Sequence, residues 1–361
     1  METIPPLQPA NHDGAILEPV MPTNDSPGTE TVTTIAIAPA VVETSPAMRS
    51  AIRTDMAKLA GVFLAAVFFM QVVGIVIVAA LISPSFRNAL GSHSPSMITA
   101  AMKDTLSLHA ALINIILVVV AALFYLLIRG RRLFTTDITT TIPVGRRWGL
   151  LARTPLIMFG IVGANNVLEN LIRAITGHNP AAAESSLVSP MSTSVLGLLF
   201  IVLIGPFIEE VVFRGAIMRF LMPYGVNFAI VTQALLFGLY HMNFWQSLFA
   251  FALGLVLGYV AARFSLKWSY ALHVLNNGVN MLMGTSETTA LVIVIATWVC
   301  LLGAIVLTIK DRIVNRPLIT EGRSTVVAHP FRTAWTQPFF LIVVIILFVV
   351  GFVFNMQAML K

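Results

Sequence analysis

Three groups of polar residues lie inside strongly apolar stretches of this sequence, and their residue types are those of a hydrolytic site. In chain order these residues are Glu209, Glu210, Arg214, His241, His273 and Asn277. Ionisable side chains inside an apolar span are costly and usually functional. A carboxylate and an imidazole can hold a water molecule and remove its proton. A second imidazole and an amide can donate hydrogen bonds to the oxyanion that forms at an attacked carbonyl.

The spacing in the first group predicts one ion pair and one free carboxylate. Glu210 and Arg214 are four residues apart, so in a helix they share a face and can pair. Glu209 points about 100° away and can face a different neighbour. We therefore expect Glu210 and Arg214 to support the site and Glu209 to act in it.

The second and third groups also have helical spacing. Phe237 lies one turn before His241, so its ring can pack against the site. His273 and Asn277 are four residues apart and project together. From estimated depths in their spans, we expect these residues to meet Glu209 in one buried cavity near the middle of the membrane.

Other hydrolytic chemistries fit this sequence less well. An aspartyl intramembrane site needs two Asp within spans, and the sequence has neither a G-x-S-G motif for a serine site nor an H-E-x-x-H zinc motif. All Asp lie outside the expected spans: Asp13, Asp25, Asp55, Asp104, Asp137 and Asp311. The set of Glu, His and Asn residues remains.

Composition places these residues in a membrane protein. Hydrophobic residues make up 57% of the 361 residues and charged residues 11%, against about a quarter charged in soluble domains. Only a bilayer can cover so much apolar surface. Because lipid cannot satisfy free backbone groups, the spans must be helices. We predict an all-α polytopic bundle of eight or nine spans, near 59–82, 108–128, 149–174, 194–219, 227–243, 246–263, 268–284, 288–308 and 337–357.

The charge distribution predicts an orientation. Lys and Arg gather before the first span and in the even-numbered loops, which is typical of cytoplasmic segments. This pattern places the N-terminus in the cytoplasm and the C-terminus outside. It also explains the net charge of +6 without nucleic acid as a partner.

The same patterns divide the chain into four parts. Residues 1–48 contain six acidic residues and no Lys or Arg, are rich in Pro and Thr, and are expected to form a disordered cytoplasmic tail. N-terminal transmembrane helices follow at 49–193. The catalytic membrane core is expected at 194–308, and a basic cytoplasmic loop with a final helix at 309–361.

At its polar groups the sequence resembles a known family. The patterns Glu209-Glu210-x-x-x-Arg214, Phe237-x-x-x-His241 and His273-x-x-x-Asn277 are similar to the signatures of the CAAX-protease and bacteriocin-processing (CPBP, or Abi) family. The resemblance covers about residues 195–285 in motif order and spacing. It implies an all-helical intramembrane glutamic protease whose substrate is a membrane-associated or CAAX-like protein or peptide.

The resemblance also implies roles. Glu209 and His241 would activate the water, while His273 and Asn277 would stabilise the oxyanion. Family members have also been described as metalloproteases, and a zinc ion held by Glu209, His241 and His273 is chemically sensible. We favour the metal-free form, with no cofactor.

Two other functions use the same residues. A non-catalytic relative, such as an immunity-type membrane protein, would bind a partner. A transporter would use Glu, His and Arg as a proton relay, but we find no internal repeat of the kind common in transporters. The polar residues near 165–170 are expected to join helices, although they could also line the cavity: Asn165, Asn166, Glu169 and Asn170.

Overall fold

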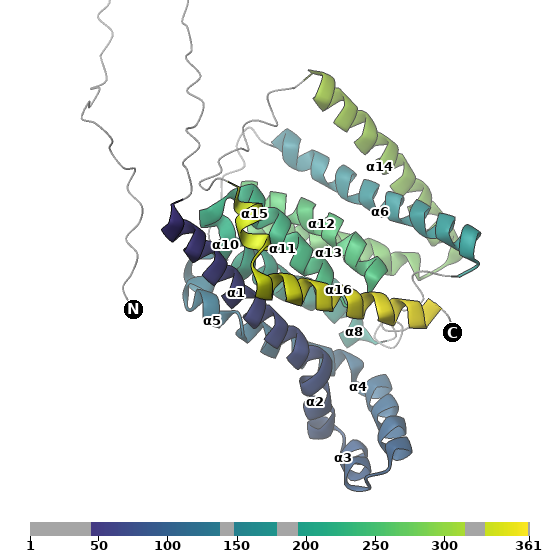
Figure 1. Ribbon diagram of the computed structural model, residues 1–361. Helices are drawn as coiled ribbons and strands as arrows, with labels where there is room; N and C mark the ends of the chain where they lie inside the picture. The colour runs from purple at the N-terminus through teal and green to yellow at the C-terminus, as the bar shows by residue number, and fades with distance from the viewer. Residues whose placement is uncertain (1–44, 138–147, 179–193, 315–328, 360–361) are drawn as a thin grey trace, which may run out of the picture. The chain divides into compact units, whose positions relative to one another are not determined.

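All regular elements in the described part of the chain are helices (Figure 1). The structure, a computed structural model, describes residues 45–137, 148–178, 194–314 and 329–359. Residues 41–361 form one compact unit, and the first 40 residues lie outside the described residues. Most of the predicted tail and residues 315–328 of the predicted basic loop also lie outside them. The predicted all-α class is confirmed.

The α-helices are α1 (Pro46–Phe68), α2 (Gly74–Ile82), α3 (Pro84–Gly91), α4 (Pro95–Leu123), α5 (Leu126–Arg129), α6 (Trp148–Thr176), α8 (Val195–Leu199), α9 (Gly205–Glu209), α10 (Met218–Leu221), α11 (Val226–Tyr240), α12 (Phe244–Arg263), α13 (Leu266–Met283), α14 (Glu287–Val314), α15 (Pro330–Trp335) and α16 (Pro338–Met359). Wider π-helical turns interrupt the long helices at η1 (Phe69–Val73), η4 (Phe200–Ile204) and η5 (Glu210–Ile217). A further π-helical turn, η2 (Leu133–Asp137), follows α5, and a 3-10 turn, η6, spans Met222–Tyr224. Such π turns are frequent at functional sites.

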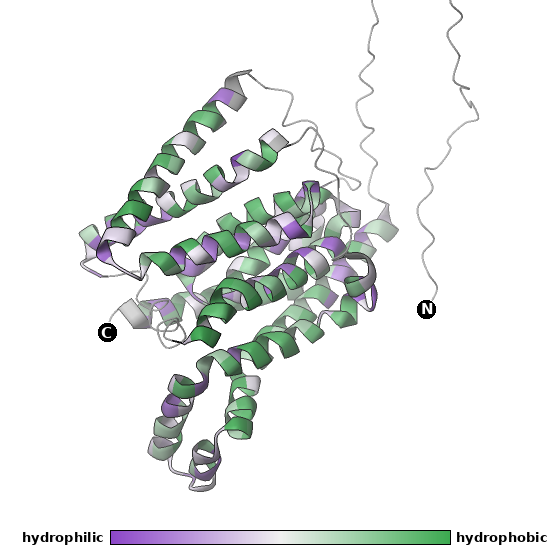
Figure 2. Cartoon of the chain, turned by 180° about the vertical axis from the view of Figure 1, so that it is seen from behind, coloured by the Kyte–Doolittle hydropathy of each residue, from purple (hydrophilic) through white to green (hydrophobic). Residues whose placement is uncertain are grey.

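Seven helical stretches of the described chain are long and apolar enough to cross a membrane. They are Pro46–Ile82, Pro95–Arg129, Gly149–Thr176, Val195–Tyr224, Phe244–Arg263, Glu287–Lys310 and Pro338–Gln357. Large apolar side chains on α14 and α16 are exposed, as lipid-facing helices require. Figure 2, which shows the chain from behind, has α14 coloured mostly as hydrophobic. The chain is thus an integral membrane protein, while the orientation of its termini stays a prediction.

The other two expected spans are helices that miss one of these criteria. α11 has 15 residues, or about 22 Å at 1.5 Å per residue, which is short of a core of about 30 Å. α13 has 18 residues, but its composition is not apolar enough because it carries His273 and three Asn residues. Both helices carry motif residues. The short helix α11 ends directly before His241, and the polar helix α13 contains His273 and Asn277.

Close packing of α11 on α12 fixes the end of α11. A Cβ added at Gly254 would lie 3.1 Å from the Ala234 Cα, and one added at Gly238 would lie 2.6 Å from the Ser247 carbonyl oxygen. The chain turns between the helices with Met242 at φ 52°, and the Asn243 side chain caps α12 by accepting the Gln246 N–H at 3.1 Å. His241 is therefore held at a well-defined corner.

The largest group of buried apolar residues joins α1, η5, α11 and α16. Phe63, Phe213, Phe237 and Phe340 are each at most 2% exposed within it. α6 and α14 lie side by side (Figure 1) because Gly160 and Gly163 let the two backbones approach. The polar motif residues thus lie on helices with extensive packing.

Candidate active site

A cavity of about 490 Å³ opens among η1, α4, α9, α11, α12 and α13. All four residues expected to be catalytic line it: Glu209, His241, His273 and Asn277. Phe237 lines it as well, whereas Glu210 and Arg214 lie outside the lining. The three sequence motifs therefore meet at one cavity, although Glu209 and Asn277 are 68 residues apart in the sequence.

The two adjacent glutamates separate as their spacing predicts. Glu209 ends α9 and its side chain keeps 18% of its surface exposed, so its carboxylate reaches the cavity. Glu210 begins the π-helical segment η5, and its side chain is 1% exposed. One carboxylate faces the space where a substrate would bind, and the other faces the protein interior.

Glu210 is the centre of a buried hydrogen-bond network. Its Oε1 accepts from Arg214 Nη1 at 2.8 Å and from His273 Nδ1 at 2.9 Å, and its Oε2 accepts from the Ser269 hydroxyl at 2.6 Å. A buried carboxylate needs such partners, because its charge is otherwise costly in an apolar interior. Glu210 thereby links η5 to two residues of α13.

Arg214 and Phe237 pack together behind the cavity. The Arg214 guanidinium carbon lies 4.4 Å from the centre of the Phe237 ring, a cation–π contact. The Phe237 ring also stands nearly perpendicular to the rings of His241 and His273, at centroid distances of 5.0 Å and 5.8 Å. Phe237 therefore holds both imidazoles in place from one side.

The partners of His273 decide the roles of its two ring nitrogens. A carboxylate can only accept, so Nδ1 carries the hydrogen that is donated to Glu210. Nε2 is left for the cavity, 3.5 Å from Glu209 Oε2. In the imidazolium form, Nε2–H is a second donor, on the side of the ring that lies near Glu209.

The hydrogen bond that orients His241 leaves its Nε2 as an acceptor, whereas Nε2 of the His273 imidazolium is a donor. The Nδ1 of His241 lies 2.8 Å from the Phe237 carbonyl oxygen, which can only accept, so Nδ1 again carries the hydrogen. In the neutral ring, Nε2 then has a free lone pair. This nitrogen can accept a proton from a water molecule in the cavity.

Asn277 is anchored by a carbonyl that the π-helical turn η4 releases. The Gly205 N–H bonds to the Phe200 carbonyl, five residues back, instead of the Ile201 carbonyl, four residues back. The Ile201 oxygen is then available and accepts from Asn277 Nδ2 at 2.9 Å. One hydrogen of the Asn277 amide is used in this bond, and the other remains for a ligand.

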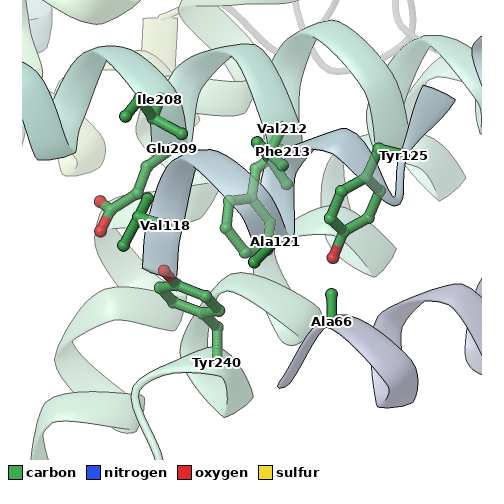
Figure 3. A pocket seen from close by; sticks show the side chains of 10 residues that line it. Ala66, Val118, Ala121, Tyr125, Ile208, Glu209, Val212, Phe213 and Tyr240 are labelled. Atoms are coloured by element: carbon green, nitrogen blue, oxygen red, sulfur yellow. The ribbon is translucent and has the colours of Figure 1, made fainter. Parts of the chain in front are cut away.

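A second, narrow space lies on the other side of Glu209. Figure 3 shows Glu209, Val118 and Tyr240 at one end of this crevice and Tyr125 at the other, with Phe213 and Ala121 between them. Its volume is about 10 Å³, close to the minimum for one water molecule. Glu209 therefore faces both a large cavity and a space of the size of water.

The donor arrangement does not suit a metal ion. Among the described residues, no three of His, Cys, Asp and Glu are arranged so that they could hold one. The zinc set of Glu209, His241 and His273 does not meet this requirement. We therefore derive no step through a metal.

Several residues of the site have no signal in the sequence motifs. Ser269 and Asn276 lie on α13 near the motif residues, but their roles depend on packing. Gln71 and Asn114 line the cavity from η1 and α4, which carry no family pattern. The one feature of the sequence that indicates a role for these residues is that polar side chains occur inside apolar spans.

The polar residues of α6 bond along their own helix. Asn165 Nδ2 donates to Glu169 at 2.7 Å, and Asn170 Nδ2 donates to the Asn166 carbonyl at 2.8 Å. None of them belongs to the lining of the cavity.

Comparison with known proteins agrees with the sequence resemblance. Residues 191–279 match the family model described as Type II CAAX prenyl endopeptidase Rce1-like. The matched segment contains all three motifs and most of the residues around the cavity. No curated protein and no solved structure matches the chain. The resemblance to the CAAX-protease family is thus confirmed over this segment, and it indicates an intramembrane endopeptidase at the level of the family.

Proposed function

With the match of residues 191–279 to a CAAX endopeptidase family as premise, we propose that this chain is an intramembrane endopeptidase in which Glu209 and His241 activate water. The substrate is a membrane-associated or CAAX-like protein or peptide. The convergence of Glu209, His241, His273 and Asn277 on one cavity is the observation that carries this proposal.

Water activation is the first step. A water molecule between the Glu209 carboxylate and His241 Nε2 can donate to both groups. Transfer of one of its protons leaves a hydroxide equivalent beside the bound peptide. The oxygen then attacks the scissile carbonyl carbon, and the electron pair of the C=O bond moves to its oxygen.

Stabilisation of that oxyanion is the task of α13. The remaining Asn277 amide hydrogen and the Nε2–H of the His273 imidazolium are the two donors. Glu210 fixes the His273 ring through Nδ1, and the Ile201 carbonyl fixes the Asn277 amide. Donors that are already oriented need no reorganisation when the charge develops, which is the main source of their catalytic effect.

Collapse of the tetrahedral intermediate completes the reaction. The C–N bond breaks, and the proton taken from water passes to the leaving amine, so atoms and charges balance. No covalent intermediate and no metal is needed. Glu210, Arg214 and Phe237 act by positioning the imidazoles.

A cleavage experiment tests this function. The full-length protein is reconstituted in liposomes and given quenched-fluorescent peptides with CAAX-like C-termini, with and without a prenyl group. We expect mass spectrometry to find new peptide termini with the parent protein. Glu209→Ala should abolish them, whereas Glu287→Ala, which changes an exposed residue at the start of α14, should retain them. Cleavage that survives in Glu209→Ala would contradict the proposal.

A further inference from the structure

Asn276 belongs to the wall of the cavity and carries a buried acceptor that is not used. The residue is 2% exposed and belongs to the cavity lining. Its Oδ1 is buried and has no hydrogen-bond partner in the described part of the chain. A buried acceptor without a partner carries a free-energy cost, so a ligand that supplies an N–H or O–H at this point gains affinity.

The orientation of this acceptor is set by its neighbour. Asn276 Nδ2 donates to Asn277 Oδ1 at 3.1 Å. This bond directs the Asn276 oxygen and the Asn277 nitrogen outward from the pair. Two adjacent residues therefore offer one acceptor and one donor, which complements the N–H and C=O groups of a peptide backbone.

The rest of the lining favours an uncharged ligand. Besides Glu209, His241, His273 and the phenol Tyr240, the described lining has no titratable side chain. Its other polar groups are neutral amides from four helical segments: Gln71, Asn114, Gln246 and Asn280. Apolar side chains cover the remaining surface. Recognition here must rely on hydrogen bonds to neutral groups and on apolar contact.

We propose that Asn276 is a substrate-binding residue whose Oδ1 accepts a backbone N–H of the peptide that is close to the scissile carbonyl but does not belong to the scissile amide. Asn277 donates to that carbonyl at the same time, so the pair sets the register of the peptide along α13. This inference rests on the proposed endopeptidase function and extends it to one further contact.

A substrate-by-variant cycle tests this contact. In one peptide that the parent protein cleaves, each amide except the scissile one is replaced in turn by an ester, which exchanges one N–H for oxygen. We expect one ester position to lower kcat/KM of the parent about tenfold, as the loss of one buried hydrogen bond implies. In Asn276→Leu and in Asn276→Ala, the same ester should cause no further loss, because the acceptor is already absent.

The alternative outcomes are distinct. An ester penalty of the same size in the parent and in both variants would mean that Asn276 only positions Asn277, and the inference would be overturned. Gel filtration and melting temperature in detergent show which of the two variants is folded, and the folded one is used. A parent protein that cleaves no peptide would instead contradict the proposed function itself.

Discussion

His273 Nδ1 lies 2.9 Å from Glu210 Oε1, and this bond leaves Nε2 of the same ring facing the cavity and Glu209. Each of the two adjacent glutamates therefore faces a different side of one imidazole. Glu210 holds the ring, and Glu209 shares the reaction space with it.

Removal of the Ser269 hydroxyl should weaken catalysis through Glu210. Ser269 donates to Glu210 Oε2 at 2.6 Å, and a hydrogen bond to a charged group contributes about 1.5–3 kcal/mol. We expect Ser269→Ala to lower kcat about tenfold or more with little change in KM, measured with a quenched-fluorescent peptide in liposomes. Thr308→Ala is the control, since Thr308 is exposed and its hydroxyl donates to the Ala304 carbonyl of its own helix at 2.8 Å. An unchanged kcat would show that this bond does not position His273.

Loss of the Glu210 carboxylate should destabilise the fold. Glu210→Ala leaves the fully buried Arg214 without its ion-pair partner. Breaking a buried pair in this way costs about 3–5 kcal/mol. We expect a clear fall of the melting temperature in detergent. Glu287→Ala, at an exposed position, should change stability by less than about 0.5 kcal/mol, and equal melting temperatures for the two variants would contradict the role of the pair.

A single methyl group at Gly238 should disturb the corner that holds His241. The added Cβ would lie 2.6 Å from the Ser247 carbonyl oxygen, so α11 and α12 must move apart. Overpacking of this kind costs about 1–3 kcal/mol. We expect Gly238→Ala to lower both the melting temperature and kcat. Gly91→Ala provides the comparison, since its Cβ would meet nothing within 4 Å; a Gly238→Ala protein as stable and active as this one would exclude the close contact.

Restoring a backbone N–H at position 206 should weaken the anchor of Asn277. Pro206 lies directly after the π turn η4, and proline removes a helical donor at this point. With alanine the regular ladder can close, and the Ile201 carbonyl then bonds within its own helix instead of to Asn277. We expect Pro206→Ala to lower kcat at unchanged or higher stability. Pro155→Ala makes the same change within α6 and should not reduce kcat; full activity of Pro206→Ala would refute the role of the π turn.

The sequence was sufficient to predict the class of fold and the grouping of the motif residues. Apolar stretches of about 20 residues identify helices whatever they pack against, so the all-α bundle follows from composition. The spacing of Glu210 and Arg214 predicts a pair that the structure has at 2.8 Å. The number of spans was harder to predict. α11 has only 15 residues, and α13 contains His273 and three Asn residues that lower its hydropathy.

Other parts of the site depend on contacts that no local pattern encodes. Ser269 bonds to Glu210 across 59 residues of sequence, and Asn277 bonds to a carbonyl 76 residues away. The Ile201 carbonyl is free because a π turn shifts the hydrogen-bond ladder by one residue and Pro206 has no N–H to donate in the shifted ladder. The periodicity of apolar residues locates a helix, but it does not reveal a shift in the hydrogen-bond ladder within that helix. It also does not reveal that η1 and α4 form part of the cavity wall.

Glu209→Gln tests the central claim most directly, because it removes the proton-accepting carboxylate and keeps the size of the side chain. The rate of cleavage of one quenched-fluorescent peptide is measured in liposomes for the parent and for Glu209→Gln, each with and without a chelator. We expect parent cleavage to resist the chelator and Glu209→Gln to reduce kcat about a hundredfold to ten-thousandfold, the usual contribution of a general base. A Glu209→Gln protein that cleaves within tenfold of the parent rate would contradict the proposed role of Glu209.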